Sequence, residues 1–206
     1  MRGDFLMYIM TGIFLFLTHN RTVSSIAGAE GPTSAMMQHA PMTTFVSILS
    51  QAFSALYTQL LSLTIILFIY HVAFNKLEIV DPSSALGMFL LAWFSGCGVG
   101  IVLLAIKPWA PRLCRIIMMA YLRLNMIASG KMFVANALPP SMIALFSWSP
   151  LFHSIDQVRG FVFINYYPRN SSWDYTLYVG VILIVIGMMA EFYTRKAASA
   201  SWSARQ

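Results

Sequence analysis

The most informative single charge in this sequence is a cation inside an apolar stretch. Arg123 lies within residues 113–129, close to Tyr121 and Asn125. Placing a cation at bilayer depth is costly unless it is paired, reaches the membrane interface or faces water. A structural ion pair, snorkelling to the interface and a place on the wall of a wet cavity therefore all stay open for Arg123. Arg115 lies near the start of the stretch, and we expect it to reach the interface.

No arrangement typical of a catalytic or metal centre is visible. The histidines are far apart, and none has a second ligand three or four residues away, as a helical metal site needs; they are His19, His39, His71 and His153. Asp and Glu total only 7, which leaves no obvious carboxylate pair. Gly96, Gly98 and Gly100 lack the Gly-Lys-Ser/Thr ending of a phosphate loop, whereas Gly96 and Gly100 have the GxxxG spacing of closely packed helices. We predict no catalytic residue, no metal ligand and no cofactor bound by this chain.

The composition indicates an integral membrane protein. Of 206 residues, 58% are hydrophobic and 10% are charged, against roughly 25% charged residues in a soluble domain. Disorder requires low hydrophobicity, and it is excluded by the same figures. The net charge of +6 comes from basic residues scattered at segment ends, which favours loops beside anionic lipids over nucleic acid as a partner. Cys97 and Cys114 are interpreted as inert apolar residues.

Five apolar stretches are candidates for membrane spans, and the whole chain reads as one all-α transmembrane domain, 1–206. The predicted spans are approximately 5–28, 46–74, 85–106, 113–129 and 175–192. Asp81 and Pro82 predict a helix start, and Lys107-Pro108 predicts the end of that helix. Counting Lys and Arg in the loops favours a cytoplasmic C-terminus.

Residues 130–168 fit neither a normal span nor a normal loop. They are apolar, but Pro139-Pro140, Pro150 and several charges interrupt them. Ser149 followed by Pro150 predicts a new helix start. We therefore expect a re-entrant helical hairpin before the last span. Because non-helical backbone at membrane depth must be covered by protein or line a water cavity, this hairpin is a candidate element of a pathway.

Two further features suggest interaction surfaces. In segment 30–43, Met36, Met37 and His39 would give a short helix a soft apolar face suited to a partner's groove, although a plain interfacial turn is the alternative. Aromatic residues make up 14% of the chain, and most are expected to form interfacial belts or packing. A minority are candidates to stack on sugar rings: Tyr57, Trp93, Phe94, Tyr121 and Phe133.

The C-terminal third resembles a known family. Residues 128–133 (ASGKMF) and 137–140 (ALPP) are similar to the SG-x-[FM]-F…LP region of ABC-2 type transporter permeases. Residues 148–159 (WSPLFHSIDQVR) closely resemble the W-N-P-L-x-H-x-I-E-x-x-R signature of that family's capsular polysaccharide and O-antigen exporters. The tyrosine-rich stretch 165–168 follows in the same order. Ser149 and Asp156 depart from the usual Asn and Glu, and both substitutions conserve capping ability or charge.

The resemblance also aligns the N-terminal half with the family. Residues 12–29 look like the second membrane span of such permeases, and 30–43 corresponds to their cytoplasmic coupling helix. The in-plane amphipathic helix and the first membrane helix of the family have no counterpart in this sequence. The expectation is therefore either a misplaced start or a shortened paralogue.

The resemblance implies the membrane-spanning subunit of an ATP-driven exporter. Such a subunit translocates a lipid-linked cell-surface polysaccharide, of capsule or O-antigen type, across the bacterial inner membrane, as a homodimer bound to an ABC ATPase dimer that holds the ATP and Mg. It implies ATPase coupling through Met36, Met37 and His39. Its periplasmic gate would comprise Lys131, Phe133, Pro139, Pro150, His153, Asp156 and Arg159. The channel would be lined by Tyr57, Trp93, Tyr121, Arg123 and Asn125. The alternatives are a teichoic acid or polyol phosphate exporter, and a truncated scaffold that does not transport.

Overall fold

The computed structural model describes residues 5–31, 43–73 and 79–203, and within these ranges the chain is helical without strands. The elements are α1 (Phe5–Gly28), α3 (Thr44–Ala73), α4 (Pro82–Ile106), α5 (Pro111–Ala128), the 3-10 helix η1 (Ala135–Ala137), α6 (Pro140–Phe146), α7 (Pro150–Val162) and α8 (Trp173–Ser203). The expectation of an all-α fold is confirmed. Helix α8 runs beyond the expected 175–192 at both ends.

Within the described ranges, three helices are long and apolar enough to cross a membrane: α3, α4 and the part of α8 from Trp173 to Ala197. These helices indicate a membrane protein. Helices α1 and α5 form within two residues of the expected boundaries but fall outside this group. The polar run His19-Asn20-Arg21 lies in the second half of α1, and three arginines interrupt the 18 residues of α5. Of the five predicted spans, three thus have the required length and apolarity among the described residues.

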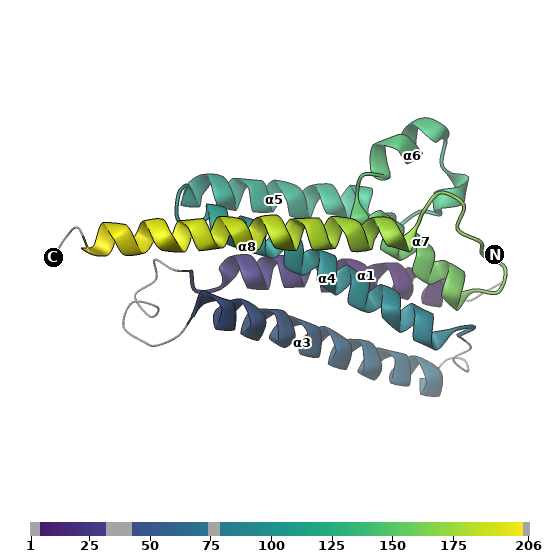
Figure 1. Cartoon of the computed structure of the whole chain (residues 1–206). Coiled ribbons are helices and arrows are strands. Elements are labelled where there is room, and N and C mark those ends of the chain that lie inside the picture. Colours follow the sequence, from purple (N-terminus) through teal and green to yellow (C-terminus); the bar gives the residue numbers. More distant parts are fainter. Residues whose placement is uncertain (1–4, 32–42, 74–78, 204–206) are drawn as a thin grey trace.

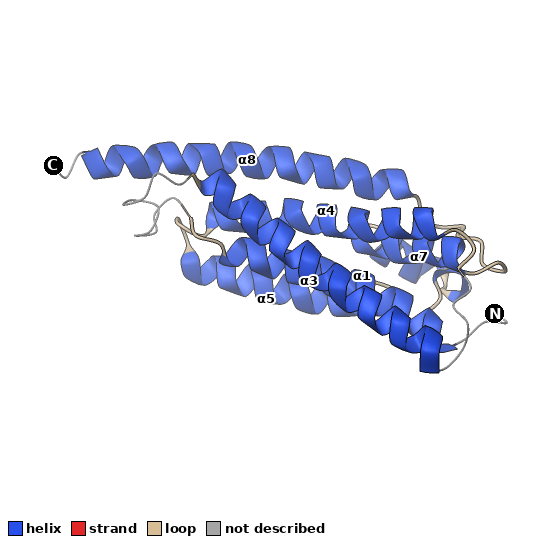
Figure 2. Cartoon of the chain, turned by 90° about the horizontal axis from the view of Figure 1, so that it is seen from below, coloured by secondary structure: helices blue, strands red, loops and turns tan. Residues whose placement is uncertain are grey.

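The long helices lie side by side and alternate in direction (Figures 1 and 2). Their connections gather at two ends of the bundle. The end that carries α6, α7 and the start of α8 is called the α7 end. The opposite end, which carries the turn between α4 and α5 at 107–110, is called the turn end. Two short helices, α6 and α7, replace a straight crossing at 130–168.

Helix α4 occupies the centre of the bundle and contacts α1, α7 and α8. Glycines allow this close approach on both sides. A Cβ atom on Gly96 would lie 2.9 Å from the backbone oxygen of His19 in α1, and one on Gly100 would lie 2.8 Å from the Ile26 Cβ. On the other side, a Cβ on Gly98 would lie 2.8 Å from Leu183 of α8. The close helix contact expected from the GxxxG spacing is confirmed.

Local signals determine the helix ends around this core. Asp81 caps α4 by accepting a hydrogen bond from the Ser84 backbone N–H (3.2 Å), and Pro82 occupies the first turn. Hydrogen bonds from Ser83 and Ser84 lower the pKa of Asp81 to about 2. After α5, Gly130 adopts a φ of 74°, the left-handed conformation that commonly terminates a helix. The predicted start of α7 at Ser149-Pro150 is also confirmed.

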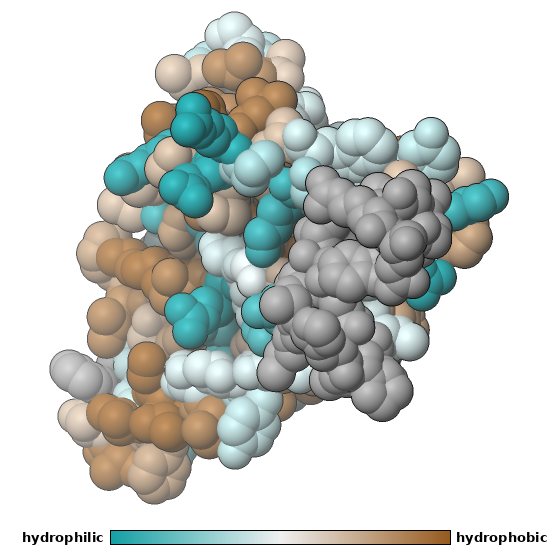
Figure 3. Space-filling view, turned by 90° about the vertical axis from the view of Figure 1, so that its left-hand side faces the viewer, coloured by the Kyte–Doolittle hydropathy of each residue, from teal (hydrophilic) through white to brown (hydrophobic). Residues whose placement is uncertain are grey.

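The outer surface exposes many apolar side chains along the helices and carries hydrophilic ones at the turn end. Large exposed apolar side chains are distributed over α3, α5 and α8, including Tyr57, Phe68, Ile127 and Met189. Such surface is unfavourable in water and suits contact with lipid. Hydrophilic side chains gather at the turn end (Figure 3). Hydrophilic and apolar side chains thus both lie on the turn end (Figure 3), whereas apolar side chains are exposed along the helices.

Candidate functional site

The most elaborate polar cluster lies on α7, at the α7 end of the bundle. His153, Asp156 and Arg159 are spaced three residues apart, so they share one side of the helix. All three are buried, with exposed fractions of 7%, 1% and 1%. Buried charges are tolerated only when hydrogen bonds satisfy them. The partners of these three side chains therefore show what the cluster holds in place.

His153 connects two turns. Its Nε2–H donates to the backbone oxygen of Ser147 (2.7 Å), and its Nδ1 accepts from the backbone N–H of Ser172 (3.1 Å). A carbonyl oxygen only accepts and an N–H only donates, so these contacts define the neutral Nε2–H tautomer. Burial lowers the pKa of His153, which favours the same neutral form. The ring joins the turn before α7 to the segment that enters α8.

Asp156 holds the irregular segment that follows α7. It accepts hydrogen bonds from the hydroxyl groups of Tyr166 and Ser171, the latter at 2.7 Å. Gln157 adds a hydrogen bond to the Ser171 backbone oxygen at 2.8 Å. Burial, followed by the hydrogen bond to Asp156, raises the pKa of Tyr166, so its hydroxyl keeps the donated proton. Two side chains of α7 thus hold a segment that has no regular structure.

Arg159 holds the chain that follows α5. Its Nη1 donates to the Phe133 backbone oxygen (2.8 Å) and its Nη2 to that of Lys131 (3.0 Å). The guanidinium carbon lies 4.0 Å from the centroid of the Tyr8 ring of α1, a cation–π contact. Gly12 makes room beside it, because a Cβ there would lie 3.0 Å from Arg159 Nη2 and from the Lys131 backbone.

The structure brings most of the predicted gate residues together. Lys131 places its ammonium 3.4 Å from the centroid of the Phe16 ring, next to the Arg159 contacts. Phe133 stacks on Phe146 of α6, with ring centroids 5.4 Å apart. Pro150 is buried at the first turn of α7, whereas Pro139 is exposed just before α6. Their proposed function as a gate remains a prediction.

A second polar cluster lies among α1, α4 and α5, and it contains two of the predicted channel residues. The Nδ1–H of His19 donates to the Ala92 backbone oxygen (3.1 Å), so its Nε2 accepts from the Tyr121 hydroxyl (2.8 Å). Asn125, which is 1% exposed, donates to the Asn20 side chain at 3.3 Å. In the single chain, Tyr121 and Asn125 therefore face the interior of the bundle and tie α5 to α1.

The other three predicted channel residues lie elsewhere. Arg123 is exposed on α5, and Tyr57 is exposed on α3. Trp93 is half-buried between α4 and α3, where its indole N–H donates to the Ala52 backbone oxygen (2.9 Å). The five residues thus do not share one surface of a single chain. The predicted coupling residues Met36, Met37 and His39 lie outside the described residues.

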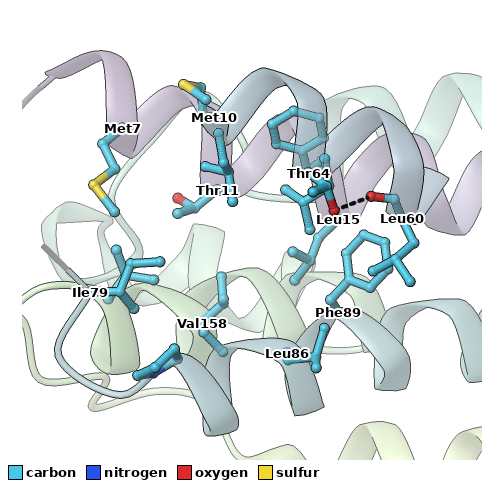
Figure 4. A pocket seen from close by; sticks show the side chains of 16 residues that line it. Met7, Met10, Thr11, Leu15, Leu60, Thr64, Ile79, Leu86, Phe89 and Val158 are labelled. Carbon is cyan, nitrogen blue, oxygen red and sulfur yellow. Dashed lines mark hydrogen bonds between the residues drawn. The ribbon is translucent and has the colours of Figure 1, made fainter. Parts of the chain in front are cut away.

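An apolar cavity of about 330 Å³ lies between α1, α3, α4 and α7 (Figure 4). Its walls include Met7, Leu15, Leu60, Phe89 and Val158. The Thr64 hydroxyl in its wall donates to the Leu60 backbone oxygen (2.9 Å), so it is already satisfied within α3. The cavity suits hydrocarbon and lacks the polar groups that chemistry or ion binding would need.

The cavity lies beside the second half of α3, which contributes Leu60, Leu63, Thr64 and Leu67 to its wall. The first half of the helix buries Thr44, Ser47, Ile48, Ala52 and Ala55, whereas Tyr70 is the buried residue of its second half. No single residue in the sequence marks such a gap, so sequence reasoning missed it. The same reasoning also missed His19 as a partner of Tyr121.

Among the described residues, no group of three or more His, Cys, Asp or Glu side chains is placed to hold a metal ion. Cys97 and Cys114 are buried free thiols. The chain matches no protein-family model and no curated protein. Fold and site together define a helical membrane protein. At one end, residues 130–168 form two short helices and irregular turns, which the buried side chains of α7 hold in place by hydrogen bonds.

Proposed function

We propose that this chain is the membrane-spanning permease subunit of an ATP-driven ABC exporter, which moves a lipid-linked cell-surface polysaccharide across the bacterial inner membrane. One observation supports this most directly. The sequence signature contains three charged or titratable residues, His153, Asp156 and Arg159. Their side chains hold the irregular parts of residues 130–172 to α7 by hydrogen bonds. The types and spacing of these residues thus serve to satisfy and position irregular backbone. A gate that contains irregular backbone at membrane depth needs such contacts.

In this proposal α1 and α5 also cross the bilayer. Three polar residues of α1, Thr18, His19 and Thr22, are fully buried, whereas Arg21 is exposed in the half of the helix nearer the turn end. A second copy of the chain forms the conduit with the first, and Arg123 on the exposed side of α5 faces that wet path. A guanidinium there binds anionic sugars or lipid phosphates. Binding along such a path must be weak and repeated for a polymer to advance.

The distribution of basic side chains supports a cytoplasmic turn end. Half-buried or exposed Lys and Arg near that end are Lys107, Arg112, Arg115, Arg195 and Lys196. Among the described residues at the α7 end, Arg159 is buried, Lys131 is half-buried and Arg169 is exposed; Arg123 is exposed within α5. Short cytoplasmic loops carry an excess of Lys and Arg. In the proposed orientation the C-terminus lies in the cytoplasm and α7 near the outer face. An ATPase dimer docks at the turn end and binds the ATP and Mg.

Deletion of the gene in its native bacterium tests the proposal. We expect the surface polysaccharide to disappear while lipid-linked glycan accumulates inside the cell. Export should return when the chain is restored together with a hydrolysis-competent ABC ATPase, and not with an ATPase that binds ATP but cannot hydrolyse it. Unchanged surface polysaccharide after deletion would refute the proposal. Chemical analysis of the retained polymer separates a polysaccharide from a polyol phosphate substrate.

A labelling experiment tests the orientation independently. In a background with Cys97 and Cys114 replaced by alanine, Ile164→Cys places a thiol at a residue that is 84% exposed at the α7 end. We expect a membrane-impermeant maleimide to label it from outside intact inner-membrane spheroplasts. Trp109→Cys, at a residue 62% exposed near the turn end, is the matched control that should be labelled only after lysis. The reverse pattern would overturn the orientation.

A further inference from the structure

A second cavity, of about 340 Å³ and lined by both polar and aromatic side chains, lies where the end of α7, the segment 163–172 and the start of α8 meet. Two aromatic side chains on its wall are accessible: Tyr167 is 79% exposed and Trp173 is 47% exposed. Gln157, Ser172 and Asp174 also line it and supply amide, hydroxyl and carboxylate groups. None of these residues belongs to the apolar cavity of Figure 4.

The wall of this cavity is held in a fixed shape. Asn136 donates to the Tyr167 backbone oxygen (2.8 Å) and accepts from the Arg169 backbone N–H (3.4 Å). Buried His153 and Asp156 hold the same segment at Ser172 and Ser171. An irregular segment held at several points by side chains is organised before a ligand arrives, which lowers the entropy cost of binding.

The wall chemistry limits the ligand. No Lys, Arg or His lines the cavity among the described residues, so a phosphate or carboxylate would lack a cationic partner. A quaternary ammonium group could use the rings and Asp174, but it cannot donate a hydrogen bond to the Gln157 amide oxygen or accept one from the Ser172 hydroxyl. A sugar ring uses both kinds of group, since its apolar C–H face covers an aromatic ring while its hydroxyls form hydrogen bonds.

We propose that this cavity binds one neutral sugar ring, stacked on Tyr167 or Trp173 and hydrogen-bonded to Gln157, Ser172 and Asp174. Its volume lies near the lower limit of the roughly 300–1,000 Å³ typical of small-molecule sites, which suits a single ring. The biological role rests on the proposed function: the site contacts a sugar unit of the polymer as that unit leaves at the α7 end.

Saturation-transfer NMR on the purified full chain in detergent tests the site. The probes are glucose, galactose, mannose and N-acetylglucosamine, each at millimolar concentration, with choline as the competing ligand class. We expect saturation of ring C–H protons for at least one sugar. Trp173→Ala and Tyr167→Ala should each weaken that binding about five- to tenfold, the loss typical of removing an aromatic side chain at the centre of a contact.

Trp148→Ala is the matched control, because Trp148 is 48% exposed, nearly the same as Trp173, and does not line the cavity. It should leave sugar binding unchanged. Tyr167 is so exposed that its truncation removes little packing, which keeps the test valid if the Trp173 variant fails to fold. Absence of sugar binding by the wild-type chain, binding by both cavity variants that is as strong as wild-type binding, or preferential binding of choline would each overturn the site.

The sugar-binding experiment and the gene-deletion experiment can fail independently of each other. If the deletion strain loses its surface polysaccharide but the chain binds no sugar, the cavity proposal fails and the exporter stands. If a sugar binds through Trp173 or Tyr167 but deletion leaves the surface polysaccharide unchanged, the site stands and the exporter proposal fails.

Discussion

Substituting Gly96 with alanine tests the packing of α1 on α4 that positions the polar clusters. A Cβ at residue 96 would lie 2.9 Å from the His19 backbone oxygen and 3.2 Å from the Thr22 Cβ. Real Cβ atoms do not approach backbone this closely, so α1 must shift as a whole. Such overpacking costs about 1–3 kcal/mol. Alanine also favours a helix interior over glycine by about 0.5–1 kcal/mol, which offsets part of that cost.

The same helix supplies a matched control. Gly87 has nothing within 4 Å of an added Cβ, so Gly87→Ala gains the helix preference of alanine without a clash. We expect Gly87→Ala to stabilise the protein by about 0.5–1 kcal/mol. Gly96→Ala should range from neutral to about 2 kcal/mol destabilising. The two variants, with identical chemistry in one helix, should therefore differ by about 1–3 kcal/mol.

Unfolding in mixed detergent micelles, titrated with a denaturing detergent and followed by circular dichroism, measures this difference. A second test position is Gly100, where an added Cβ would lie 2.8 Å from the Ile26 Cβ. If Gly96→Ala and Gly100→Ala are both as stable as Gly87→Ala, then α1 does not pack against α4 as described. The assignment of the His19 cluster, which depends on that packing, would fall with it.

Three further predictions concern single contacts. Trp93→Phe keeps an aromatic ring but loses the hydrogen bond to Ala52, and it should lower the free energy of unfolding by about 1 kcal/mol in the same titration. Folding keeps His153 neutral by lowering its pKa from 6.5, so its contribution to stability is complete above pH 6.5 and is lost as the pH falls from there toward the lowered pKa. His153→Gln should remove this dependence, and a slope that survives the substitution contradicts it. Arg159→Lys loses the paired donation to the Lys131 and Phe133 carbonyls. A nitroxide spin label attached through Met132→Cys, at a residue 74% exposed in the wild type, should therefore become more mobile in its electron spin resonance spectrum. Unchanged mobility would show that the guanidinium does not hold this segment.

Features with a local cause were predictable from the sequence. The start of α4 follows from Asp81 and Pro82, whose cap and fixed φ act within one turn. The start of α7 at Ser149-Pro150 follows from the same helix-start signal, although the Ser149 side chain makes no capping hydrogen bond. In each case the interacting groups are neighbours in sequence, so the pattern carries the information.

Features that depend on distant contacts were not predictable in the same way. Arg123 stood out because of its charge, yet it is exposed in the single chain, whereas Tyr121 and Asn125 beside it face inward. The partner of Tyr121 is His19, 102 residues away. A histidine within a predicted membrane span was the available signal, since an ionisable group at that depth needs a partner. The sequence could not say which partner, because that depends on how α1 and α5 pack.

The role of His153, Asp156 and Arg159 on α7 can be read only from contacts with residues distant in sequence. In sequence, His153, Asp156 and Arg159 suggest charges near a pathway. In the structure they make two irregular segments depend on one helix, since Arg159 holds residues 131–133 while Asp156 and His153 hold residues 166–172. Neither segment has a regular backbone ladder of its own, so a displacement of α7 must either carry both segments with it or break buried hydrogen bonds. Because breaking buried polar contacts is costly, coupled movement of α7 with both segments is the favoured response.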